Sequence, residues 1–95
     1  MAPTAWGVGK QTLKAGRGIA LHMHEGEDEI LYVESGKGIG VVGNQQKEIF
    51  AGSMIYIPLG AWHGRRSTEE MKIIWIVSPP NFADYLRECL AIRGR

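Results

Sequence analysis

Cysteine is nearly absent from this sequence, since Cys89 is the single one among 95 residues. One cysteine excludes an internal disulfide and a zinc site built from four cysteines. A reducing compartment is compatible with this count. Cys89 falls on an apolar stripe near the C-terminus, so packing is its expected role and a redox thiol is the alternative.

The chain also lacks a long hydrophobic run and a strong charge of either sign. Its longest apolar stretch, Ile73 to Val77, is far too short to cross a bilayer. The formal net charge is +1 and the basic residues are scattered, so we expect neither a nucleic-acid partner nor a membrane partner. Residues 1–6 show no positive segment leading into an apolar one, which predicts no signal peptide and a cytoplasmic location.

Glycine, in contrast, is abundant, with 13 residues spread at short intervals. The glycines separate brief segments rich in valine, isoleucine, tyrosine and tryptophan, which is the pattern of short antiparallel strands. A turn about every ten residues is typical of a β-sandwich or small barrel. We expect one domain over residues 1–95, with strands at 8–13, 19–24, 29–34, 39–42, 46–50, 53–57, 63–66 and 71–78.

A short helix is expected after the last strand, over roughly residues 81–93. Pro79 and Pro80 stop the strand, and Asn81 can cap the helix. Its apolar residues fall on one stripe, namely Phe82, Tyr85, Leu86, Cys89 and Leu90. The last strand is apolar on both faces, so its outer face needs a cover, for which this helix and a second subunit are the two candidates.

Three histidines and one glutamate are the candidate metal ligands. His22 and His24 are separated by one residue in a strand-like segment, and alternate side chains of a strand share a face. Glu29 follows five residues later, and a turn containing proline and glycine precedes His63. Imidazoles suit zinc, iron, nickel and copper, and a carboxylate extends the choice to manganese. The alternative is that these residues are structural or exposed.

The same residues give the chain a resemblance to the cupin superfamily. The first cupin motif reads glycine, five residues, His-X-His, three or four residues, glutamate, six residues, glycine. The second reads glycine, five residues, proline, one residue, glycine, two residues, histidine, three residues, asparagine. The matching positions are Gly16, His22, His24, Glu29 and Gly36 in the first motif, and Gly52, Pro58, Gly60 and His63 in the second, while Ser67 stands where asparagine is usual.

The resemblance implies an all-β jelly-roll barrel, a double-stranded β-helix, here followed by the short C-terminal helix. It implies that His22, His24, Glu29 and His63 hold one divalent metal ion, which is iron, manganese, nickel or zinc. Such a ligand set leaves positions open for water, substrate or dioxygen. Glu29 can be a ligand or a catalytic base. The resemblance also makes a homodimer the better explanation for the apolar outer face.

The function expected from the resemblance is a metal-dependent enzyme acting on a small organic molecule, with a dioxygenase, and hence an oxidoreductase, as the first choice. A non-redox isomerase, lyase or decarboxylase is the second, and a non-catalytic binding or sensor protein is the third. The fold alone does not choose among them.

Arg65 gives an indication of the chemical class of the substrate. If His63 points inward, strand alternation sends Arg65 and Ser67 to the same face. A guanidinium beside a metal favours a carboxylate or enolate substrate, which makes Arg65 a candidate catalytic residue together with Glu29. The alternative is a solvated charge. We further expect the acidic run Glu25, Glu27 and Asp28 to be a solvated loop, and the aromatic residues Trp62, Trp75, Tyr32 and Tyr56 to pack in the core or line a pocket.

Overall fold

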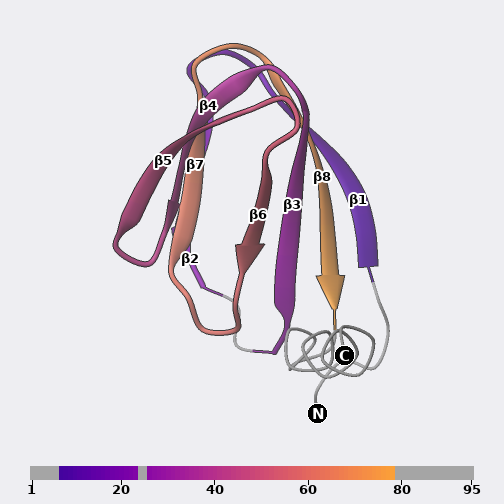
Figure 1. Cartoon of the computed structure of the whole chain (residues 1–95), viewed down its shortest axis with the longest axis vertical. Helices are drawn as coiled ribbons and strands as arrows, with labels where there is room; N and C mark the ends of the chain where they lie inside the picture. Colours follow the sequence, from indigo (N-terminus) through magenta and orange to yellow (C-terminus); the bar gives the residue numbers. More distant parts are fainter. Residues whose placement is uncertain (1–6, 24–25, 79–95) are drawn as a thin grey trace, which may run out of the picture.

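The computed structural model describes residues 7–23 and 26–78, which form eight antiparallel strands in two four-stranded sheets (Figure 1). The strands are β1 (Gly7–Leu13), β2 (Gly18–His22), β3 (Asp28–Ser35), β4 (Lys37–Val42), β5 (Gln45–Phe50), β6 (Met54–Ile57), β7 (His63–Ser67) and β8 (Met71–Ser78). Sheet A has the order β1-β8-β3-β6, and sheet B has the order β2-β7-β4-β5. The predicted all-β double-stranded β-helix is therefore confirmed.

The chain passes from one sheet to the other at every connection except the β4–β5 hairpin. Residues far apart in the sequence consequently face each other across the barrel. The observed strands begin and end within two residues of the predicted ones, and β2 ends at His22 rather than at residue 24. The expected C-terminal helix lies outside the described residues, and no helix in the described part of the chain is long and apolar enough to cross a membrane.

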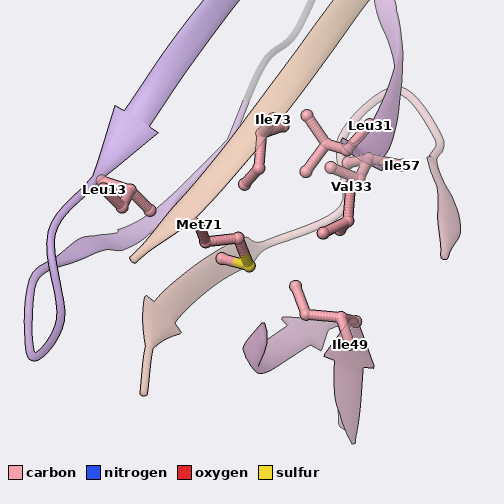
Figure 2. Packing of buried hydrophobic residues seen from close by; sticks show 7 residues of the cluster. All are labelled: Leu13, Leu31, Val33, Ile49, Ile57, Met71 and Ile73. Carbon is pink, nitrogen blue, oxygen red and sulfur yellow. The ribbon is translucent and has the colours of Figure 1, made fainter. Parts of the chain in front are cut away.

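The apolar core comes almost entirely from sheet A. Its members are Leu13, Leu31, Val33, Ile57, Met71 and Ile73 of sheet A and Ile49 of sheet B (Figure 2). The inward side chains of β7, the second strand of sheet B, are instead polar, and all are buried: His63, Arg65 and Ser67. Sheet A thus supplies most of the buried apolar side chains, and the buried polar side chains of sheet B are those of β7.

The outer face of sheet A is largely apolar, with Lys10 of β1 as a charged member. The registers place Val8, Ile76, Ile30 and Tyr56 in one row and Lys10, Ile74, Tyr32 and Met54 in the next. Val8 is 66% exposed and Met54 is 70% exposed. The expectation of core positions is wrong for three of the aromatic residues, because Tyr32, Tyr56 and Trp62 are exposed. A contiguous exposed apolar patch is typical of an interaction surface.

We propose this outer face as the contact surface of the predicted homodimer. Tyr32→Glu should then give monomers, because a carboxylate in the middle of an apolar interface would be buried without a partner. Sedimentation velocity at micromolar concentration measures the change. Gln46→Glu, on the exposed strand β5 of sheet B, is the matched control and should remain dimeric. A monomeric wild-type protein would contradict the prediction.

Gly36 allows the β3–β4 turn to pack closely against the β7–β8 connection. Its φ is +83°, and a Cβ at this position would clash with the backbone carbonyl oxygen of Glu70. Gly52 has a similar φ of +93°, but a Cβ there would meet no atom within 4 Å. Comparing alanine substitutions at the two positions therefore distinguishes two effects. Both substitutions strain a left-handed conformation, but only the one at Gly36 also produces a clash.

Gly36→Ala should lower the free energy of unfolding by at least about 2 kcal/mol more than Gly52→Ala. Both variants incur the strain of a positive φ, roughly 1–2 kcal/mol, but only the first must also move a backbone segment. Urea denaturation of the two variants measures the difference. Equal losses would show that the β3–β4 turn does not pack against Glu70 as described.

Candidate functional site

His22 and His63 lie beside each other in sheet B, close to one end of the barrel. They are register partners on the paired strands β2 and β7, and β2 has an irregularity between Ile19 and His22. Their ring centroids are 4.1 Å apart with an angle of 55° between the planes. His63 is almost fully buried, at 1% exposure, while His22 is partly buried. The barrel therefore brings two of the three predicted histidine ligands into contact.

Each of these imidazoles uses its Nδ1 atom in a hydrogen bond to a backbone carbonyl. His22 Nδ1 is 2.8 Å from the Ala20 oxygen, and His63 Nδ1 is 3.0 Å from the Ala61 oxygen. Because a carbonyl oxygen only accepts, the proton of each ring must be on Nδ1. In the neutral ring, Nε2 then carries the lone pair. This is the usual arrangement of a metal-binding histidine, whose other nitrogen donates to a protein group.

Glu29 approaches the histidines from the opposite sheet. It lies in β3 and is buried, and its Oε1 is 3.3 Å from His63 Nε2. His24, the remaining predicted ligand, lies outside the described residues. Within residues 7–23 and 26–78, no group of three or more histidine, cysteine, aspartate or glutamate residues has the geometry to hold a metal ion. The donor types of His22, His63 and Glu29 nevertheless suit a divalent ion.

Arg65 points inward, two residues after His63 on the same strand. It is 8% exposed, and its Nη2 donates a hydrogen bond to Gln11 Oε1 in β1, at 2.7 Å. Burial lowers the pKa of the guanidinium, while the nearby negative charge of Glu29 opposes that effect. Arg65 Nε is buried and has no hydrogen-bond acceptor among the described residues. Arg65 is therefore an interior group rather than a solvated charge at a strand end.

A cavity of about 340 Å³ lies beside Arg65. It is lined by Gln11, Glu27, Glu29, Arg65, Trp75 and Val77. The ring of Trp75 packs directly on Gly9, because a Cβ on Gly9 would collide with it. The volume suits a small molecule. The cavity thus combines a guanidinium, two carboxylates and an indole ring, and one of the carboxylates contacts His63.

Two residues near the site have roles that the sequence did not reveal. Asp28 is not solvated, which corrects the expectation for the acidic run, because it is 3% exposed and its Oδ1 accepts the Leu59 N–H at 2.9 Å. Gln11 gave no local signal, because its contact with Arg65 joins residues that are 54 positions apart.

Ser67, which replaces the usual asparagine, donates its hydroxyl proton to the Leu13 and Lys14 carbonyl oxygens, each at 3.1 Å.

Comparison with known families agrees with this architecture. The family model described as the cupin domain matches residues 9–77. This match covers more than half of the chain, and the two sheets have the expected jelly-roll order. The chain therefore belongs to the cupin domain family.

Three relatives illustrate the similarity. The uncharacterized protein YrkC of Bacillus subtilis is 33% identical over 78 residues, which cover 74% of this chain and 42% of YrkC. The crystal structure of BH2720 from Bacillus halodurans has a TM-score of 0.75 and 32% identity, covering 79% of this chain and 63% of that one. A predicted oxalate decarboxylase from Thermotoga maritima has a TM-score of 0.73 and 26% identity, covering 76% and 64%. The chain therefore spans less than two thirds of the length of each relative.

Proposed function

We propose that the protein is a metal-dependent enzyme that acts on a small carboxylic acid. The observation that carries this proposal is the position of Arg65. Its buried guanidinium lines the same cavity as Glu29, and Glu29 contacts His63. A buried guanidinium and one candidate metal ligand, Glu29, therefore adjoin one space that is large enough for a small substrate, and Glu29 connects that space to His63.

The metal would be held by Nε2 of His22 and of His63 and by the carboxylate of Glu29, with His24 as the fourth ligand that the sequence motif supplies. The Nδ1 hydrogen bonds to Ala20 and Ala61 support this assignment, because they leave Nε2 as the coordinating nitrogen. These residues would hold a divalent ion whose chemistry would be that of a Lewis acid on an oxygen atom of the substrate.

Arg65 would bind the carboxylate of the substrate. A guanidinium has five N–H donors in a planar fork, and Gln11 accepts from only one of its nitrogens. The buried Nε is a further donor that a carboxylate can use, and paired contacts of this kind are strong and directional. Burying a cation is costly, and because Glu29 offsets that cost only in part, an anionic ligand would stabilise this arrangement further.

The carboxylate site favours the non-redox class over the dioxygenase that the sequence suggested first. The relative from Thermotoga maritima is described as a predicted oxalate decarboxylase, and its similarity supports chemistry on a short acid. A decarboxylase must also deliver a proton to the carbon that loses carbon dioxide. Glu27 also lines the cavity and can carry that proton, while Glu29 is assigned to the metal.

Metal binding should depend strongly on the histidines and less on Glu29. His22→Ala and His63→Ala should each reduce metal content more than about tenfold while the barrel stays folded. Losing even a residue that only hydrogen-bonds to a metal ligand typically lowers metal affinity by about tenfold or more. Elemental analysis after anaerobic purification, with circular dichroism as the folding check, measures both. Glu34→Gln, an exposed carboxylate on the same strand as Glu29, is the control for Glu29→Gln.

Turnover of the metal-loaded protein then tests the reaction class. With oxalate and other short carboxylic acids, we expect carbon dioxide release without oxygen uptake. Oxygen uptake that depends on iron would favour the dioxygenase instead. Undiminished metal in the His63→Ala protein would refute the ligand assignment, and binding of acids without any turnover would identify a binding protein.

Arg65→Ala should weaken the binding of oxalate by roughly tenfold or more, because a hydrogen bond to a charged group contributes about 1.5–3 kcal/mol. Its metal content should be unchanged. Arg66→Ala is the matched control, because this neighbouring arginine is exposed. Isothermal titration of the metal-loaded proteins measures the affinities. Equal oxalate affinity in the Arg65→Ala and wild-type proteins would rule out the carboxylate site.

A further inference from the structure

The Asp28 carboxylate connects the start of β3 to the turn that precedes His63. Asp28 Oδ1 accepts the N–H of Leu59 at 2.9 Å, and the side chain is almost completely buried. A buried carboxylate that accepts a backbone N–H makes a strong, charge-assisted hydrogen bond. The loop from Pro58 to Trp62 is therefore fixed to sheet A at its first available donor, since Pro58 itself has no N–H.

The loop itself has the geometry of a type II turn. Ala61 N donates to the Pro58 oxygen at 3.1 Å, and Gly60, the third residue of the turn, has a φ of +80°. The Leu59 N–H takes no part in the hydrogen bond that closes such a turn, so Asp28 supplies its acceptor. At the other end, Gly43 N donates to the Trp62 oxygen at 2.7 Å. The turn is thus held both at its entrance and at its exit.

The same turn supplies the hydrogen-bond partner of His63. The Ala61 carbonyl oxygen accepts the proton on His63 Nδ1, and Ala61 is the last residue of the turn that Asp28 holds. The other tautomer has a competing partner, because His63 Nε2 is 3.3 Å from Glu29 Oε1. If the Ala61 carbonyl moved, the proton could pass to Nε2 and be donated to Glu29. Nε2 would then have no lone pair for a metal.

His22 provides an internal contrast. Its Nδ1 bonds to the Ala20 oxygen within the same strand, at 2.8 Å. This contact involves neither Asp28 nor the Pro58–Trp62 loop. Disturbing the loop should therefore affect one histidine of the pair and leave the other unchanged.

We propose that Asp28 is a positioning residue for His63. By fixing the turn, it keeps the proton of His63 on Nδ1 and leaves the lone pair of Nε2 on the side of Glu29, which lines the cavity. Adjacent residues of β3 then act on the same imidazole in two ways, with Glu29 touching it directly and Asp28 acting through the loop. The consequence for metal binding rests on the function proposed above, but the tautomer does not, because it is a property of the metal-free protein.

The test is the imidazole nitrogen spectrum of the metal-free protein, recorded at a pH of about 8, above the ordinary histidine pKa of roughly 6.5. Long-range 1H–15N correlations report which nitrogen of His22 and of His63 is protonated. In Asp28→Ala, we expect the His63 tautomer ratio to shift roughly fivefold towards Nε2–H, the effect of weakening one ordinary hydrogen bond. His22 should stay unchanged. Asp28→Asn, which retains an acceptor oxygen, should restore most of the wild-type ratio.

Two further variants keep the test decisive. Ser53→Ala is the matched control, because it removes another bond from a side chain to a turn, the 3.0 Å contact with Phe50 N, at a place unconnected to His63. Gly60→Ala strains the turn without touching Asp28 and should reproduce the change at His63. If Asp28→Ala fails to fold, Gly60→Ala serves as the test variant in its place. A wild-type His63 spectrum in a folded Asp28→Ala or Gly60→Ala protein would overturn the proposal, as would equal changes at both histidines.

Zinc titration of the same variants gives the second readout. Asp28→Ala should bind Zn²⁺ about tenfold more weakly than the wild type, which is typical when a group that orients a ligand is lost. Asp28→Asn and Ser53→Ala should remain close to the wild type. If the wild-type protein binds no metal, the proposed function fails, whereas the tautomer measurement still decides the role of Asp28.

Discussion

Each inward side chain of β7 is joined to a group of the opposite sheet, and the site depends on these polar contacts. His63 meets Glu29 of β3, Arg65 meets Gln11 of β1, and Ser67 meets the Leu13 carbonyl oxygen. Because the apolar core comes almost wholly from sheet A, the two walls are not held together by hydrophobic packing alone. Three of these groups, Gln11, Glu29 and Arg65, also line the cavity.

The sequence was informative wherever a local pattern decides the outcome. Strand alternation offered the inward face for Arg65 with a solvated charge as the alternative, and the structure shows Arg65 buried. Glycine spacing located the turns. The positive φ angles of Gly36 and Gly60 give a physical reason for glycine at these motif positions. The resemblance to the cupin motifs also implied that Glu29 and His63 would meet, although they belong to different sheets.

The sequence was misleading or silent wherever tertiary contacts decide. Asp28 stands in an acidic run that looks solvated, yet the loop from β6 to β7 folds over it and supplies its donor. Gln11 reads as an ordinary polar strand residue, and only the position of β1 beside β8 brings it into reach of Arg65. Tyr32 and Tyr56 are aromatic residues at outward positions, where strand alternation outweighs hydrophobicity.

The contacts between the two sheets also determine which atoms of the site are available to bind a ligand. A carboxylate can bind the spare donors of Arg65 while the Gln11 hydrogen bond stays in place, so anion binding need not separate β1 from β7. A metal ion, in contrast, would take the Nε2 lone pair of His63 and the carboxylate of Glu29, which already face each other. His63 and Glu29 would then serve as ligands rather than contact each other directly. The alignment of His63 must then come from elsewhere, and the turn held by Asp28 provides it without using any atom that the metal needs.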